Sequence, residues 1–232
     1  MNGWSEAVRQ VMPHVVKVEL PDSHGSGFLI AYRNIGRNRQ CVVIATAAHV
    51  VRHAAKWDVP CRIHYQGQEL VLKPEQRAMG LFGNEDVGVI EFDPGEFKLP
   101  PRVLTVLDRK TVLEPGYPLG WCGFPNIMDW HNCSFAGHVS TPVEGSEGDY
   151  LVDGVVIHGV SGSPAFAVMD GRVVLVGLVS AYYPNRATGE ALPGMGLVQS
   201  IHPIIDFFLR ANKSNKKGSR HGRTKSGKRQ EA

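Results

Sequence analysis

Short apolar runs separated by turn residues fill most of this chain. Val, Ile and Leu alternate with polar residues or cluster over a few positions, as in HVVKVEL, QCVVIAT, VGVIEF and RVLTV. Gly, Pro, Asn and Asp gather between the runs. Such runs are typical of half-buried and fully buried β-strands. The pattern predicts about a dozen short strands, and therefore an all-β sandwich or a pair of barrels.

Two segments have the spacing of a helix instead. Residues 3–12 form a short helix at the start of the predicted domain, and residues 202–212 (HPIIDFFLRAN) form the second. The apolar face of the second helix consists of Ile204, Ile205, Phe208 and Leu209. The segment LDRKTVLEPG (107–116) lacks the strand pattern and divides the predicted strands about evenly, which indicates two halves.

Charge is distributed unevenly along the 232 residues. The formal net charge is +3, but residues 210–232 hold nine of the 25 Lys and Arg and one of the 22 Asp and Glu. The remaining 16 basic and 21 acidic residues give the folded part a net charge of −5, against +8 for the tail. From Lys213 onward there is no large apolar residue, so residues 213–232 should be a disordered basic tail.

Several classes of protein are disfavoured by composition. No apolar run is long enough to span a bilayer. Glu6 and Arg9 interrupt the stretch in which a signal peptide needs unbroken apolar residues. The four cysteines are too few and too dispersed for a disulfide scaffold. We therefore expect a cytoplasmic protein without a membrane partner.

The stretch GVSGSPAF (159–166) places a small hydroxyl, Ser161, between glycines and beside strand-like flanks. Gly159 and Gly162 can adopt backbone angles that other residues avoid. By itself the stretch fits an ordinary turn, since Gly and Ser are common there. A serine nucleophile would also need a base and an acid that orients the base. His49, directly after an apolar strand, and Asp86, at the start of another, supply these two groups.

In this order the pieces resemble the chymotrypsin-fold (trypsin-like) serine peptidases, most closely the bacterial HtrA (DegP) and glutamyl-endopeptidase branches. The matching pieces are GSGFLI, TAAHV around His49, DVGVI at Asp86, GVSGSP at Ser161, GLVSAYY and GMGLVQSI. The resemblance implies an all-β fold of two six-stranded Greek-key barrels with a C-terminal helix. The first barrel would occupy residues 1–109, and the second, with the closing helix, residues 110–212.

The resemblance also implies a role for each site residue. Ser161 would be the nucleophile, His49 the general base, and Asp86 the carboxylate that orients and stabilises the imidazole. Backbone N–H groups of Gly159 and Ser161 would form the oxyanion hole. The substrate would be a protein or peptide, and neither a cofactor nor a metal is expected. Val160 stands where digestive members carry an acid that pairs with a newly cut N-terminus, which predicts an enzyme made without that activation.

The substrate pocket would be built by three segments. Its predicted residues are Val155, Val156, Ile157, His158, Ser180, Ala181, Tyr182 and Gly196. None is acidic, so a buried Lys or Arg side chain would find no partner. We expect cleavage after small or medium apolar residues, and His158 at the lip could also admit acidic side chains.

Four alternatives remain open from the residues. The fold could have lost catalysis and serve as a binding or scaffold module. His49 and His53 have zinc-binding spacing, but Val50 replaces the glutamate that a zinc peptidase needs, and His53 fits a surface position on a short helix. Cys122 and Cys133, with His131, lack a fourth ligand at conventional spacing. The tail could bind a polyanion or an acidic surface, or only improve solubility.

Overall fold

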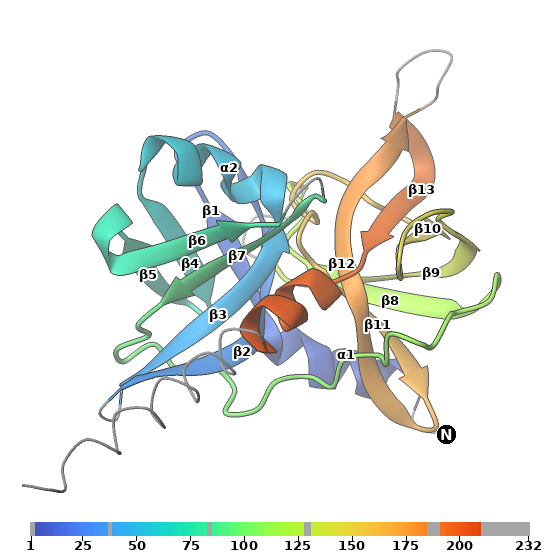
Figure 1. Ribbon diagram of the computed structural model, residues 1–232. Coiled ribbons are helices and arrows are strands. Elements are labelled where there is room, and N and C mark those ends of the chain that lie inside the picture. The colour runs from blue at the N-terminus through green and yellow to red at the C-terminus, as the bar shows by residue number, and fades with distance from the viewer. Residues whose placement is uncertain (1–2, 37–38, 83–84, 128–130, 185–190, 210–232) are drawn as a thin grey trace, which may run out of the picture. The chain divides into compact units, whose positions relative to one another are not determined.

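The structure is a computed structural model that describes residues 3–36, 39–82, 85–127, 131–184 and 191–209, and it confirms the all-β class. Residues 1–201 form one compact unit, in which strands gather into two sheets (Figure 1). The strands of the first sheet are β1 (Val15–Glu19), β2 (His24–Gly36), β3 (Arg39–Ala47), β4 (Cys61–Tyr65), β5 (Gln68–Leu72), β6 (Arg77–Leu81) and β7 (Val87–Phe92). Those of the second are β8 (Pro118–Gly123), β9 (Cys133–Pro142), β10 (Tyr150–Asp153), β11 (Pro164–Met169), β12 (Arg172–Pro184) and β13 (Ala191–Gln199).

The first sheet is antiparallel in the order β5-β4-β1-β2-β3-β7-β6 and is half a barrel. It has seven strands where we predicted six, and its two edge strands, β5 and β6, do not pair with each other in the described part of the chain. The seventh is β6, whose sequence RAMGL carries little β-propensity and is held by its pairing with β7. The run RVLTV (102–106), predicted as a strand, follows two prolines and forms only a single bridge from Val106 to Leu175.

The second sheet closes on itself as a six-stranded barrel in the order β10-β13-β12-β11-β8-β9. Its core holds fully buried large side chains, including Trp121 and Tyr150. The polar atom of each of these side chains also forms a hydrogen bond. The Trp121 indole N–H donates to the Val155 carbonyl at 3.0 Å, and the Tyr150 hydroxyl accepts from the Leu113 N–H at 3.1 Å. The core thereby fixes the loop before Ser161 and the segment that joins the two sheets.

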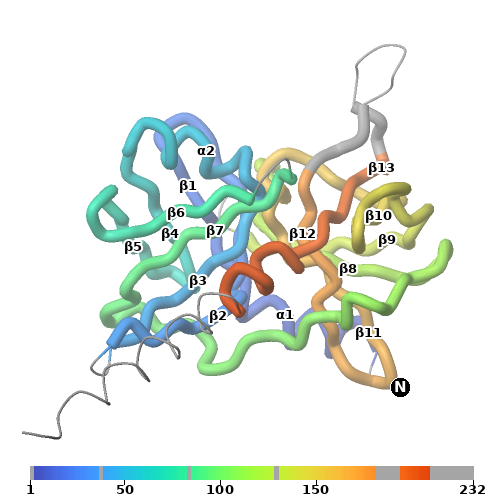
Figure 2. Tube along the Cα trace, in the orientation of Figure 1, coloured from blue at the N-terminus to red at the C-terminus, as the bar shows by residue number. Residues whose placement is uncertain are grey.

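The chain passes once between the sheets, along the segment from the end of β7 to the start of β8 (Figure 2). The domain boundary that we predict after residue 109 falls inside this segment and stays a prediction. The sheets also contact one another directly, because β1 and β2 lie against β8 and β3 lies against β12. This contact places the residues of the candidate site next to each other.

Helices are few among the described residues. The predicted first helix is α1 (Trp4–Val11), which buries Ala7 and Val11 against Cys122 and Phe166 of the second barrel. Helix α2 (Ala48–Trp57) follows β3 and carries His49; our pattern reading did not assign it as an element of its own. Residues 202–209 are helical, and the rest of the predicted helix lies outside the described residues. Within the described ranges, no helix has the length and apolar character that crossing a membrane requires.

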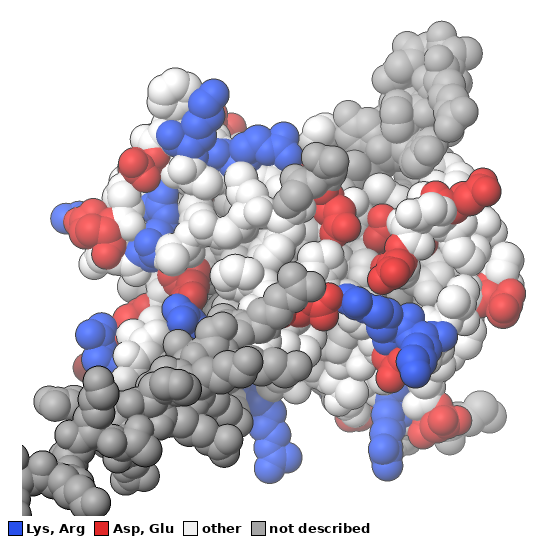
Figure 3. All heavy atoms as spheres, viewed as in Figure 1, with Lys and Arg blue, Asp and Glu red and all other residues white. Residues whose placement is uncertain are grey.

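Charges of both signs are interspersed on the face of the molecule shown in Figure 3, without one large region of a single sign. On this face, therefore, no single acidic region accounts for the negative charge of the folded part. The predicted basic tail, residues 213–232, lies outside the described residues.

Candidate active site

His49 lies at the junction of a buried strand and a helix. Strand β3 ends at the fully buried Ala47, and α2 begins at the next residue. The Ala48 N–H donates to the Asp86 carbonyl at 3.0 Å, which ties the junction to the strand next to it. Val50 and Val51 anchor the helix in the core, whereas the His49 side chain is 45% exposed. The imidazole is thus held on a rigid base and remains accessible from solvent.

Asp86 precedes β7 and contacts His49 through both of its carboxylate oxygens. Its Oδ1 accepts the His49 backbone N–H at 2.7 Å, and its Oδ2 lies 2.5 Å from the ring Nδ1. An ionised carboxylate can only accept, so the proton of a neutral His49 ring belongs on Nδ1. The other ring nitrogen, Nε2, then carries a lone pair and can act as a base.

Two residues of the second barrel complete the surroundings of Asp86. The Ser180 hydroxyl donates to Oδ2 at 2.8 Å, and the Asp86 N–H donates to the Gln199 Oε1 at 3.1 Å. Burial of Asp86 by itself would raise the pKa of its carboxyl group. The His49 ring, the Ser180 hydroxyl and the His49 N–H together outweigh burial and lower the pKa below its ordinary value of 3.8. Asp86 is therefore a carboxylate at neutral pH.

The turn that carries Ser161 depends on two glycines. Gly159 has φ +89° and Gly162 has φ +88°, values that strain any residue with a Cβ. The surroundings are also tight, since a Cβ on Gly162 would lie 2.0 Å from the Ser26 carbonyl oxygen. A Cβ on Gly159 would lie 2.2 Å from the Phe124 carbonyl oxygen. The glycines at 159 and 162 are thus required by both conformation and space.

Hydrogen bonds fix the peptide units of this turn in a definite order. The His158 carbonyl accepts from the Asn126 N–H at 2.9 Å, and the Val160 carbonyl accepts from the Ser163 N–H at 3.0 Å. In a planar trans peptide the N–H points opposite to the C=O. The N–H groups of Gly159 and Ser161 therefore point away from these partners. Neither donates to a backbone acceptor among the described residues, so both remain available to an oxyanion.

A cavity of about 540 Å³ brings the predicted residues together. Ser161, His49, Gly159 and His158 line it, with Asn126 and residues of the β1–β2 loop opposite. Of the predicted triad, Ser161 and His49 face this cavity, and Asp86 lies behind His49. The predicted site is thus assembled from both sheets around one space.

The predicted substrate-pocket residues are placed less closely together. Among them, His158 lines the cavity, and Val155 is 48% exposed. Val156 packs on Gly196, where a Cβ would lie 2.3 Å from the Val156 Cγ2. The Ser180 hydroxyl is directed to Asp86. Ile157 is partly buried against the barrel core. Ala181 and Tyr182 belong to β12, but their side chains lie outside the description.

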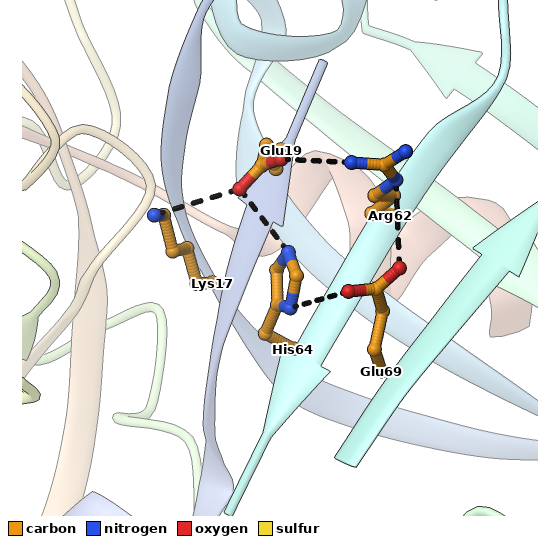
Figure 4. Close-up of polar contacts among 5 residues, drawn as sticks. All are labelled: Lys17, Glu19, Arg62, His64 and Glu69. Carbon is orange, nitrogen blue, oxygen red and sulfur yellow. Dashed lines mark hydrogen bonds and ion pairs between the residues drawn. The ribbon is translucent and has the colours of Figure 1, made fainter. Parts of the chain in front are cut away.

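A network of charged side chains supports one wall of the cavity (Figure 4). Glu19 lines the cavity and ends β1; its carboxylate lies 3.6 Å from the Lys17 Nζ, 3.4 Å from an Arg62 nitrogen and 3.2 Å from the His64 Nε2. Glu69 on β5 faces the other side of Arg62 and His64. Because Lys17 and His64 are almost fully buried, the network holds β1, β4 and β5 in register beside the site.

The histidine and cysteine pairs that we considered as metal ligands have other partners. His49 faces Asp86. His53, on the surface of α2, has its Nδ1 3.4 Å from Asp22 of the β1–β2 loop. Burial, with a smaller effect of Cys133, raises the pKa of the Cys122 thiol to about 12. A thiol with so high a pKa stays protonated in the absence of a metal.

Sequence reasoning did not find several residues that shape the site. Gln199 and Ser26 reach it only through contacts across the sheets, and Asn126 reaches it from the loop after β8. Ser180 was assigned to the pocket without its bond to Asp86. The one available signal was GSG at residues 25–27, which we used for the resemblance without giving its serine a role.

Two β-sheets that meet around a Ser, a His and an Asp are the architecture of the chymotrypsin fold, in which the second sheet here is a closed barrel and the first is a half-barrel. The chain belongs to the trypsin-like peptidase domain family, whose model matches residues 25–178, a span that includes His49, Asp86 and Ser161. The resemblance drawn from the sequence is thereby confirmed.

Solved structures give the same fold. The Rv3671c protease from M. tuberculosis in its active form is 16% identical, with 86% of this chain and 81% of that chain covered and a TM-score of 0.57. Its inactive form is 17% identical, with 86% and 89% covered and a TM-score of 0.59. Deg5 is 20% identical, with 89% and 90% covered and a TM-score of 0.58. No curated protein matches the chain.

The lowered pKa of Asp86 predicts a specific dependence of stability on pH. Because the folded-state pKa lies below the unfolded one, the carboxylate stabilises the fold above the unfolded value, and this contribution is lost as pH falls through the folded-state pKa. Between about pH 6 and pH 3, the wild type should lose more free energy of unfolding than Asp86→Asn. Urea unfolding at both pH values measures the difference. A dependence in Asp86→Asn equal to that of the wild type would contradict the assignment.

Proposed function

We propose that this protein is a serine endopeptidase that uses Ser161, His49 and Asp86 as its catalytic triad. The observation that carries the proposal is the convergence of His49 and Ser161 on one cavity, with the Asp86 carboxylate on the far side of the imidazole. Trypsin-like peptidase membership gives the class of reaction, which is hydrolysis of a peptide bond in a protein or peptide substrate.

The chemistry follows from the arrangement of protons. His49 Nε2 takes the proton of Ser161 as its Oγ attacks the carbonyl carbon of the substrate, and Asp86 stabilises the imidazolium that forms. The oxyanion is bound by the N–H groups of Gly159 and Ser161. His49 then gives the proton to the leaving amine, which leaves an acyl-enzyme at Ser161. Water, deprotonated by His49, then attacks the acyl carbon; the bond from that carbon to the Ser161 Oγ breaks, His49 returns the proton to Oγ, and the carboxylic acid product leaves.

We infer further that activity does not need a newly formed N-terminus. Val160 occupies the position of the acid that such an activation uses, and it is fully buried in the barrel core. The peptides around it are oriented by internal donors, namely the N–H groups of Asn126 and Ser163. These contacts hold the turn before Ser161 in place, which in digestive relatives requires the ion pair with the newly formed N-terminal amine.

Substitution of the triad tests the proposal directly. Ser161→Ala and His49→Ala should each abolish peptide hydrolysis and covalent labelling by a fluorophosphonate, because nucleophile and base act as one unit. Asp86→Asn should keep the fold but lose most of the rate, on the order of a thousandfold or more, since the wrong imidazole tautomer is favoured. Intact-mass spectrometry after labelling reports the adduct. A folded wild-type protein that acquires no adduct would favour the inactive scaffold module instead.

We propose a preference for small or medium apolar residues on the acyl side of the cleaved bond. The valines Val155 and Val156 and the small Gly196 support it, because they provide an apolar surface without an acid. Cleavage profiling with a peptide library from a whole proteome should show this preference, and few cuts after Lys or Arg. Ser161→Ala protein is the control for contaminating peptidases. Efficient cleavage after Arg or Lys would contradict this account of the pocket.

The basic tail gives a separate proposal about partners. Its eight Lys and Arg stand among Gly and Ser without an aromatic residue, so it could bind phosphates but not read bases. A chain that ends at Asn212 should keep full peptidase activity and lose its affinity for duplex DNA of mixed sequence. If about four phosphates are contacted, the affinity of the full chain should fall about a hundredfold between about 50 and 200 mM salt. Equal DNA binding by both chains would leave the tail a solubilising segment.

A further inference from the structure

We propose that Ser26 is a positioning residue that orients the oxyanion hole from the opposite sheet, an inference that rests on the proposed function. Ser26 is the third residue of β2, in the sequence HGSGF, and it is completely buried. It belongs to the first sheet, whereas the nucleophile and both oxyanion donors belong to the second half of the chain. Its hydroxyl does not line the catalytic cavity.

The Ser26 hydroxyl joins two loops of the second half of the chain. Its Oγ accepts the Phe124 N–H at 2.9 Å and donates to the Gly159 carbonyl at 2.8 Å. The Ser26 N–H donates to the Ser161 carbonyl at 2.8 Å. One residue therefore contacts the loop after β8 and both ends of the turn that carries the oxyanion donors.

These bonds act on the peptide units that flank each donor. The Gly159 carbonyl and the Val160 N–H form one peptide unit. While the carbonyl accepts from Ser26, the Val160 N–H donates to the Ile157 carbonyl at 3.1 Å. Both polar groups of that peptide are thus paired in opposite directions. The loop that Phe124 begins also supplies the Asn126 N–H to the His158 carbonyl. By holding Phe124, Ser26 keeps in place the donor that turns the Gly159 N–H toward the cavity.

The surroundings leave little room for a different arrangement. A Cβ on Gly123 would lie 2.6 Å from the Ser26 Oγ, and a Cβ on Gly25 would lie 3.0 Å from the Ser161 carbonyl oxygen. Loss of the hydroxyl would leave the Phe124 N–H and the Gly159 carbonyl without this partner in a buried place. Unpaired groups of this kind favour rotation of the peptide toward another partner. The geometry that would suffer is the orientation of the oxyanion donors.

A reaction that needs only the triad and the oxyanion hole provides the test. With a fluorophosphonate, the Ser161 Oγ forms a bond to phosphorus, fluoride leaves, and His49 takes the serine proton. The phosphoryl oxygen occupies the oxyanion hole, so the limiting rate of labelling (kinact) depends on the two donors, whereas the half-saturating concentration (KI) reports binding of the probe. We expect Ser26→Ala to lower kinact by about ten- to a hundredfold with KI little changed, less than the loss of a whole donor.

Thr46→Val is the matched control. The Thr46 hydroxyl donates to the Ser26 carbonyl at 2.7 Å, is equally buried, and has no contact with the hydroxyl bridge. Ser26→Ala removes the two buried hydrogen bonds of the Ser26 hydroxyl, and Thr46→Val removes the one that the Ser26 carbonyl accepts, so both should lower the unfolding midpoint in urea. Only Ser26→Ala should lower kinact at a temperature at which both proteins are folded. A merely structural role would change the two midpoints and leave both kinact values at the wild-type level.

The outcomes separate this inference from the proposed function. Wild-type kinact in folded Ser26→Ala, with no labelling of Ser161→Ala, would overturn the role of Ser26 and leave the peptidase assignment intact. The wild-type mass shift in Ser161→Ala would overturn the assignment itself. Should Ser26→Ala not fold, Ser26→Cys retains a weak donor and acceptor of similar size. An intermediate kinact for this variant supports the role, and a wild-type kinact contradicts it.

Discussion

Hydrogen bonds that cross between the two sheets hold each half of the candidate site in place. Asp86 is supported from the second barrel by Ser180, whose hydroxyl donates to its carboxylate, and by Gln199, whose side-chain oxygen accepts its backbone N–H. The turn of Ser161 is supported from the first sheet by Ser26. Each sheet thus adds bonds that support the other sheet's share of the candidate site. Correct docking of the sheets is therefore the condition on which the geometry of the site depends.

This reciprocal support explains the strict demands on small residues near the contact between the sheets. Gly162 must allow the Ser26 carbonyl to approach, and Gly25 must allow the Ser161 carbonyl to approach. Side chains at these positions would separate the strands just where the bonds have to form. Close packing and polar pairing thus act together, because a buried peptide group is tolerated only if its partner comes within bonding distance.

The proposed catalytic residues and the proposed specificity residues differ in their surroundings. The proposed triad residues His49 and Asp86 and the turn of Ser161 have short, directed hydrogen bonds, whereas Val155 is exposed and the residues around it are partly exposed. On the other side of the cavity, Glu19 is restrained by Lys17, Arg62 and His64. The cavity is therefore bordered at Glu19 by a charged network, whereas the proposed specificity residues Val155 and Val156 are apolar.

The sequence by itself determined the class of fold, the positions of most strands along the chain, and the residues His49, Asp86 and Ser161 as candidates. Alternation of apolar residues reports burial within a few positions, and the glycines around Ser161 report a turn of unusual backbone angles. These signals are local. The specificity pocket, the domain boundary and the role of the tail remain predictions. Strand β6 was missed because its own residues favour no strand, and only its neighbour β7 makes it one.

Only the tertiary structure decided how these candidates are supported. Ser26 and Gly159 are 133 residues apart in the chain, Asp86 and Gln199 are 113 apart, and Asp86 and Ser180 are 94 apart. No local pattern announces such bonds, since a serine or a glutamine in a strand has the same sequence signal whether it meets water, backbone or a carboxylate. Their partners are set by the angle and register at which two sheets pack, and that is a property of the whole folded chain.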